Sequence, residues 1–168
     1  MTKFHDGQVG AAAARLSVDS PIGPLLLAGD DVALTHVLLP GTTALGSTRG
    51  AVPGPLRSAA AQLEEYFSGV RRSFALPLAP AGTGFQVSVW KALEEIPYGE
   101  TITYGELAGR VGRPGAFRAV GQANGANPLP IVYPCHRVVA AGGHLGGYGG
   151  GLDAKRRLLA LEGVAPLR

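Results

Sequence analysis

The sequence predicts a mixed α/β (α+β) fold in two parts: an N-terminal domain with a small antiparallel sheet, and a helical C-terminal domain with a helix-turn-helix. Short apolar runs separated by turn residues occupy the start of the first half, as in a strand meander. The second half carries capping-box patterns that start short helices. A segment rich in Pro and Gly at 77–84 separates the two, so we place the domains at 1–80 and 81–168.

Three strands are predicted in the first half, at residues 15–19, 25–28 and 32–39. The turn sequences Ser20-Pro21-Ile22-Gly23 and Gly29-Asp30-Asp31 lie between them. Connections this short join neighbouring strands into an antiparallel meander. Residues 40–54 form a loop rich in Gly, Thr and Pro, which is the least ordered stretch that we expect.

A helix is predicted after this loop, at residues 55–67. Pro55 is tolerated at a first helical position, and Gly69 stops the helix. Residues 73–78 are a further candidate strand, which would join the sheet of the first domain.

The second half begins with a helix whose capping box consists of Thr83 and Gln86, and Pro97 ends it. Its apolar side chains share one helical face: Phe85, Val89, Leu93 and Ile96. The last helix covers 154–162, with Asp153 as its N-cap and Gly163 as its stop.

Between these helices lies a pair of shorter ones. The capping box of Thr103 and Glu106 starts a helix that runs to about Val111. After a break at 112–115, another helix covers 116–124 and is closed by Gly125. Two short helices joined by a Gly-containing turn are typical of a helix-turn-helix, although αα-hairpins share the pattern.

Basic residues gather in the second half. The formal net charge of +3 lies entirely in residues 85–168. Residues 107–157 contain seven basic side chains and one acidic one: Arg110, Arg113, Arg118, Arg137, Lys155, Arg156 and Arg157 against Asp153. Such a cluster is either a solvated face or the footprint of a polyanion, most simply nucleic acid.

The single cysteine, Cys135, excludes an intrachain disulfide. The four histidines show no paired ligand spacing, so we expect no metal. No apolar run approaches the length of about 18 residues that a membrane span needs. The first residues contain no apolar segment typical of a secretory signal, so we expect a cytoplasmic protein.

Cys135 is followed by His136 and Arg137, two cationic neighbours that favour the thiolate. In an extended chain His136 would point to the opposite face, so it would act through a bridging water or from a tight turn. Glu162 is a candidate to orient His136, because a carboxylate is disfavoured at the C-terminal end of a helix unless a basic group meets it. An exposed helix-end Glu is the alternative. A papain-like arrangement is not expected, because only 33 residues follow Cys135.

The segment Pro134-Cys135-His136-Arg137-Val138, with Asn127-Pro128 before it and the glycines around Tyr148 after it, resembles the active-site signature of the O6-alkylguanine-DNA alkyltransferases. These are the methylated-DNA–protein-cysteine methyltransferases. The resemblance covers nearly the whole chain and continues in further segments: 20–25, 85–91, 96–101, 104–105, 118–121 and 158–163.

The resemblance implies an N-terminal domain similar to ribonuclease H and a winged-helix-like C-terminal domain that enters the minor groove and flips the damaged base out. It also implies the chemistry: Glu162 orients His136, which takes the proton of Cys135 through a water. The thiolate then removes the alkyl group from O6 of guanine, and also from O4 of thymine. No cofactor removes the alkyl group from sulfur, so each molecule acts once. Self-association on DNA is left open.

Further roles follow from the same resemblance. Tyr104 would protonate or hydrogen-bond the leaving guanine, and Asn127 would hold the turn that bears the nucleophile. Tyr148 would wall the pocket, while the backbone of Val138 and Gly149 would read the base. The expected DNA contacts are Arg118, which replaces the extruded base, together with Ala119, Gly121, Thr103 and Arg113.

Phe117 departs from the family pattern, because relatives often carry a smaller residue there. We expect it to pack against the preceding helix rather than to wedge into DNA.

Three other functions compete. A non-catalytic alkyltransferase-like protein that binds damaged DNA would lack the nucleophile, whereas this chain keeps Cys135. A regulator that senses alkylated cysteine would need further DNA-binding and metal domains. A thiol redox sensor would not explain the basic helix pair.

Overall fold

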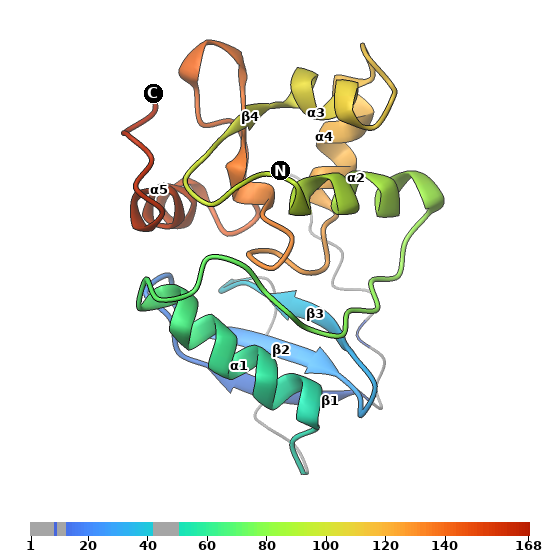
Figure 1. The fold of residues 1–168 in the computed structure, drawn as a ribbon, viewed down its shortest axis with the longest axis vertical. Helices are drawn as coiled ribbons and strands as arrows, with labels where there is room; N and C mark the ends of the chain where they lie inside the picture. The colour runs from blue at the N-terminus through green and yellow to red at the C-terminus, as the bar shows by residue number, and fades with distance from the viewer. Residues whose placement is uncertain (1–8, 10–12, 42–50) are drawn as a thin grey trace. The chain divides into compact units, whose positions relative to one another are not determined.

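The computed structural model describes residues 9, 13–41 and 51–168. The chain divides into two compact units, Met1–Ala81 and Gly82–Arg168, drawn in Figure 1. This division lies one residue from the boundary expected from the sequence. Within the described ranges, no helix combines the length and apolarity needed to cross a bilayer.

The first unit contains the predicted three-stranded meander, in the order β1 (Ala14–Val18), β2 (Leu25–Gly29) and β3 (Leu34–Leu38), with both pairs antiparallel. The third strand starts two residues later than predicted. The reason is local: the Asp30 carboxylate accepts hydrogen bonds from the N–H groups of Val32 (2.8 Å) and Ala33 (2.9 Å), which holds both residues in a turn.

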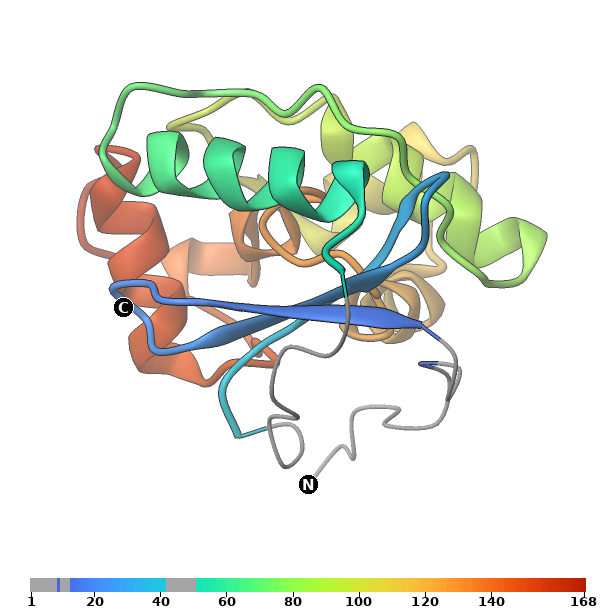
Figure 2. The same cartoon turned by 90° about the horizontal axis from the view of Figure 1, so that it is seen from below.

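Helix α1 (Gly54–Phe67) covers one face of this sheet, as Figure 2 shows. Its buried side chains recur at helical spacing and meet the strands: Leu56, Ala59, Leu63 and Tyr66. The expected loop at 40–54 lies largely outside the described residues, since 42–50 are not among them.

The predicted strand at 73–78 is wrong, because only a single bridge joins Leu78 to Leu34 of β3. The side chain of Gln62 takes both backbone hydrogen-bonding groups of Ala75, at 2.8 and 2.9 Å. Pro77 has no N–H to donate to a neighbouring strand. A longer ladder is therefore impossible here.

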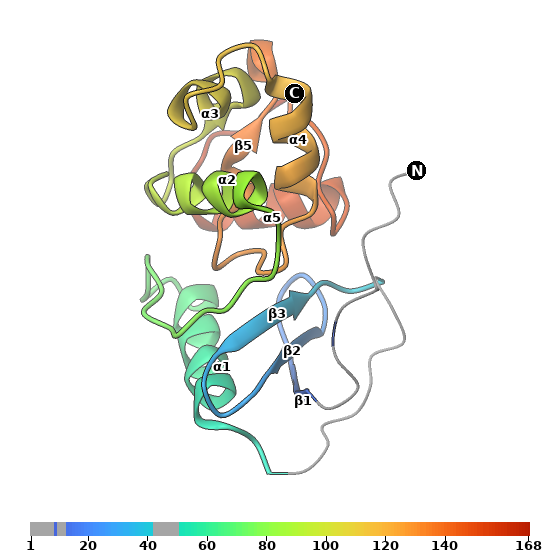
Figure 3. The ribbon, with the colours of Figure 1, turned by 90° about the vertical axis from the view of Figure 1, so that its right-hand side faces the viewer.

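In the second unit, helices α2 (Gly84–Glu94), α3 (Tyr104–Arg110) and α4 (Phe117–Gly125) pack against one another, as Figure 3 shows. Both predicted capping boxes are present, at the starts of α2 and α3. The Trp90 indole N–H donates to the Ala123 carbonyl at 2.8 Å and ties α2 to α4. Helix α2 ends before Ile96, which is nevertheless buried. Gly125 is not the expected stop: it is the last residue of α4, and the chain leaves the helix at Ala126.

A one-turn 3₁₀ helix, η1 (Cys135–Arg137), precedes the short strand β5 (Val138–Val139), which pairs in parallel with β4 (Ile102–Thr103). A second 3₁₀ turn, η2 (Ala141–Gly143), leads into the glycine-rich loop. The last helix is α5 (Leu152–Leu161). The prediction that Asp153 is the N-cap of this helix is wrong. The cap is Gly151, and Asp153 lies inside the first turn, where it pairs with Arg156 at 3.2 Å.

Candidate active site

The loop that precedes Cys135 is held by Asn127. Its amide Nδ2 donates to the Tyr133 carbonyl at 2.8 Å, and its Oδ1 accepts the Leu129 N–H at 3.0 Å. The Tyr133 N–H also donates to the Leu129 carbonyl at 2.8 Å. At the tip of this closed loop Ile131 has φ = 75°, a conformation that a β-branched residue adopts only under constraint. The sequence expectation placed Asn127 at this turn, and the structure brings it there.

Pro134 then turns the chain into Cys135. Its φ of −77° and ψ of 64° are those of an inverse γ-turn, closed by the Cys135 N–H and the Tyr133 carbonyl at 2.7 Å. Proline suits this position because its φ is already fixed near −65°. Cys135 therefore lies on a 3₁₀ turn rather than in an extended chain, so the argument that would point His136 to the opposite face does not apply.

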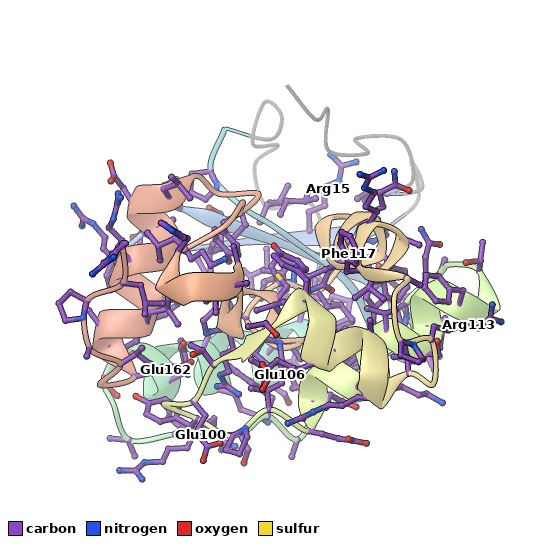
Figure 4. All side chains as sticks on the ribbon, turned by 90° about the horizontal axis from the view of Figure 1, so that it is seen from above. Arg15, Glu100, Glu106, Arg113, Phe117 and Glu162 are labelled. Carbon is purple, nitrogen blue, oxygen red and sulfur yellow. The ribbon has the colours of Figure 1, made fainter. Side chains whose placement is uncertain are left out.

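His136 and Arg137 meet the carboxylate of Glu162, which follows α5 (Figure 4). The His136 Nε2 lies 2.8 Å from Glu162 Oε1, and Arg137 donates to both carboxylate oxygens at 2.9 Å. The Gly99 N–H donates to Glu162 as well, at 3.2 Å. The side chain of Glu162 is fully buried, so the exposed helix-end alternative is wrong.

Gly99 was not identified from the sequence as part of this network. It has φ = 81°, and a Cβ at this position would approach the Glu162 carbonyl oxygen to 2.9 Å. Only glycine therefore fits the turn that presents its N–H to the carboxylate. The Arg137 Nη1 also bonds the Ile96 carbonyl of the same turn, at 2.6 Å.

The network fixes the protonation states of its members. Burial acts to raise the pKa of Glu162, but hydrogen bonds with His136 and Arg137 and their charges outweigh it and hold the pKa well below its usual value. Burial lowers the pKa of His136, against the opposing effect of Glu162. A neutral His136 that donates from Nε2 to a carboxylate leaves Nδ1 unprotonated. That buried Nδ1 has no hydrogen-bond partner among the described residues.

The thiol of Cys135 is buried, and burial raises its pKa to about 11. The side chain of Asn127, the charge of Lys155 and the N–H groups of Cys135 and His136 act in the opposite direction. The sequence argument, that His136 and Arg137 stabilise the thiolate by their charge, is therefore wrong. His136 is neutral, and the charge of Arg137 is matched by Glu162.

Lys155 was missed as a site residue. It is fully buried, and its Nζ donates to the carbonyls of Val138 (2.7 Å), Gly147 (3.1 Å) and Leu145. The ammonium thus joins β5 to the glycine-rich loop. Burial lowers the pKa of Lys155 to about 8. A signal was present in the sequence, since Lys155 falls on the apolar face of α5 with its buried residues Ala154, Leu158 and Leu159.

The basic cluster is consequently smaller than its sequence suggests. Lys155 and Arg137 are buried, so only five of the seven basic side chains remain exposed: Arg110, Arg113, Arg118, Arg156 and Arg157.

Two tyrosines lie near the thiol. Burial raises the pKa of Tyr104, as does the charge of Cys135, while a hydrogen bond with the Asn124 side chain lowers it. The phenol therefore stays protonated and able to donate. Gly146, at φ = 69°, leaves room for its ring, because a Cβ there would lie 3.2 Å from Tyr104 Cε2. Burial raises the pKa of Tyr148 well above its usual value, and its buried hydroxyl has no hydrogen-bond partner in the described part of the chain.

The residues expected to contact DNA or the base are spread over several elements and are not gathered around the thiol of Cys135. Arg113, Arg118 and Ala119 are exposed on the α3–α4 connection and the start of α4, while Gly121 faces Tyr104. The Thr103 hydroxyl is engaged with Glu106 at the start of α3.

Val138 is buried, with its carbonyl bonded by Lys155, and Gly149 lies half-buried in the glycine-rich loop. Phe117, which we predict to pack against the preceding helix, is 52% exposed. The described residues hold no group of three or more His, Cys, Asp or Glu side chains arranged to bind a metal.

Known proteins resemble this chain over most of its length. The DNA binding domain of 6-O-methylguanine DNA methyltransferase matches residues 84–164, and the ribonuclease-like domain of that family matches 16–80. The methylated-DNA–protein-cysteine methyltransferase of Methanosarcina acetivorans is 53% identical over 152 residues, covering 86% of this chain and 95% of that protein. The Mycobacterium leprae protein of the same name is 53% identical over 148 residues, covering 87% and 90%.

Solved structures agree. The O6-methylguanine methyltransferase of Mycobacterium tuberculosis superposes with a TM-score of 0.81 at 50% identity, covering 92% of this chain and 95% of that one. The Mycobacterium tuberculosis OGT in complex with DNA gives 0.79 at 52% identity, covering 87% and 90%. Sequence, fold and the arrangement around Cys135 lead to one conclusion: this chain belongs to the 6-O-methylguanine DNA methyltransferase family.

Proposed function

We propose that the protein repairs O6-alkylguanine in DNA by transferring the alkyl group, once and irreversibly, to its own Cys135. The observation that carries this proposal is the buried Cys135–His136–Glu162 arrangement in a chain of this family, in which the buried Nδ1 atom of His136 has no hydrogen-bond partner among the described residues. A buried thiol with a pKa of about 11 is inert by itself, so transfer needs a base beside it.

In the proposed reaction, His136 Nδ1 takes the thiol proton through one bridging water. The ionised Glu162 stabilises the imidazolium that forms, as a carboxylate does in other nucleophile–histidine pairs. The thiolate attacks the alkyl carbon, so that a C–S bond forms while the C–O6 bond breaks. The guanine receives a proton from the Tyr104 phenol, which is replenished from His136. The net change moves the alkyl group to sulfur and the thiol proton to guanine.

DNA would bind through α3 and α4, with Arg113 in contact with the duplex and Arg118 in the place of the extruded base. Small residues at Ala119 and Gly121 favour close approach to the minor groove, and Thr103 would contribute at the start of α3. The damaged nucleotide would be flipped out, because the thiol is buried and cannot reach a stacked base.

Within the pocket, Tyr148 would wall the base, and the backbone of Val138 and Gly149 would recognise its edge. The Val138 carbonyl oxygen already accepts a hydrogen bond from Lys155, so the base would donate to the second lone pair of this oxygen. O4-alkylthymine is proposed as a second substrate. A cytoplasmic location suits the free thiol, which persists in a reducing compartment.

The test is the intact mass of the protein after mixing with duplex DNA that contains one O6-methylguanine. We expect a gain of one methyl group per molecule, located on the Cys135 peptide and saturating at one equivalent of DNA. Cys135→Ser should show no gain yet still bind the duplex. A protein that binds the lesion without any mass gain would be the non-catalytic alternative, and continued turnover beyond one equivalent would exclude the irreversible mechanism.

A further inference from the structure

Among the residues that the structure describes, Phe117 is one of four large apolar residues that are exposed. It is the first residue of α4 and is 52% exposed (Figure 4). Its ring does have one neighbour of note: the guanidinium carbon of Arg118 lies 6.0 Å from the ring centroid, within the range of a cation–π contact. Phe117 and Arg118 therefore form an exposed pair of one aromatic and one cationic side chain.

The helical position of Phe117 relates it to the pocket. Residues 117, 121 and 124 share one face of α4, since they are four and then three residues apart. This face meets Tyr104: a Cβ at Gly121 would lie 3.8 Å from the Tyr104 ring, and the Asn124 side chain lowers the pKa of the phenol. The charge of Cys135 in turn raises the pKa of that phenol.

Phe117 thus lies one helical turn before Gly121, on the side of α4 that faces Tyr104. Because helical side chains lean towards the N-terminus, its ring projects beyond the start of the helix. The aromatic ring consequently lies at the N-terminal end of the α4 face that meets Tyr104.

The surroundings of Phe117 identify its partner. Arg113, four residues before it in the chain, and Arg118, directly after it, are both exposed, which suits a polyanion. A single exposed aromatic between cations does not form the contiguous apolar patch that docks another protein. An aromatic ring among arginines is instead suited to stacking on nucleic-acid bases.

We propose that Phe117 is a wedge that inserts at the base step beside the extruded nucleotide and works together with Arg118 to hold the duplex open. This inference rests on the proposed function. Apolar side chains such as Phe and Leu unstack base steps in this way in minor-groove proteins. The wedge would lower the free energy of the flipped state and so increase the rate at which duplex lesions react, without touching the alkyl group itself.

The experiment compares Phe117→Ala with wild type in single-turnover transfer from duplex O6-methylguanine and from the free base O6-benzylguanine, which needs no flipping. We expect the ratio of the duplex rate to the free-base rate to fall about tenfold, as for the loss of one base–aromatic stacking contact. Phe117→Leu should recover most of that ratio, because leucine also serves as a wedge. Val70→Ala, a truncation of another exposed apolar side chain in the first unit, is the matched control.

A second readout measures the inserted state directly. With 2-aminopurine placed beside the lesion, wild type should raise its fluorescence by unstacking it, and Phe117→Ala should raise it less. Equal losses on duplex and free base, or no loss on either, would overturn the wedge. If wild type did not react with the duplex lesion, the proposed function itself would fail, whereas a wild type that reacts with both substrates and an unchanged ratio in Phe117→Ala would overturn the wedge alone.

Discussion

Glu162→Gln removes the charge from a carboxylate that serves four donors. His136, both donating nitrogens of Arg137 and the Gly99 N–H converge on it at 2.8 to 3.2 Å. Glutamine has nearly the same volume but only one acceptor oxygen, and its NH₂ group would face a donor. Arg137, whose side chain is only 6% exposed, would keep its charge without a counterion.

The cost of this change follows from those contacts. Removing one partner of a buried ion pair costs about 3–5 kcal/mol, against a total stability of about 5–15 kcal/mol for a typical domain. For a unit of this size each kcal/mol shifts Tm by about 4–8 °C, so Tm should fall by at least about 12 °C. In the molecules that remain folded, transfer should slow on the order of ten- to hundredfold, which corresponds to the free energy of one hydrogen bond to a charged group.

Urea unfolding at pH 7 measures the loss of stability, and single-turnover transfer of the benzyl group from O6-benzylguanine to the protein, well below Tm, measures the loss of rate. Glu65→Gln is the matched control, because the ion pair between Glu65 and Arg71 is partly exposed and is worth at most about 1 kcal/mol. The pKa of Glu162 is lowered in the folded state, so its contribution is present above pH 4.5 and lost as pH falls below it. The stability gap between variant and wild type should narrow in acid. A loss below about 1 kcal/mol with an unchanged rate would refute the whole argument.

Three further predictions concern neighbouring groups. Arg118→Ala should slow transfer from duplex far more than transfer from free O6-benzylguanine, since base extrusion costs a few kcal/mol that the arginine offsets; similar fractional losses would leave it as an ordinary phosphate contact. Lys155→Met should slow transfer from the free base, because the lost charge lets the pKa of Cys135 rise above about 11; an unchanged rate in a folded variant would contradict this. The transfer rate should stay level from pH 7.5 to about 6.5 and fall only at lower pH, because burial lowers the pKa of His136; a decline that begins above pH 6.5 would show that the base is another group.

Much of this protein was accessible from its sequence because the interactions involved are local. The capping boxes of Thr83 and Thr103 link residues three apart, and the turn at Asp30 is made by its own side chain. The strand meander follows from short turns between apolar runs, and the helix pair from its Gly-containing break. The candidate nucleophile was identified from the motif around Cys135, with the family resemblance supplying its role.

What the sequence did not reveal is where charged and aromatic side chains lie. Lys155 and Arg137 counted as surface cations in the linear charge balance, yet one is buried among backbone carbonyls and the other against Glu162. Phe117 was expected to pack against the preceding helix, yet it is 52% exposed. The Gly99 N–H meets the Glu162 carboxylate across 63 residues of chain.

For the charged groups the physical reason is the same. Burial of a charge is tolerated only where donors and acceptors from several segments converge on it, and those segments become neighbours only when the chain folds. The sequence by itself determined the local elements and the reactive cysteine. The tertiary structure alone decided which charges leave water and so set the protonation states around that cysteine.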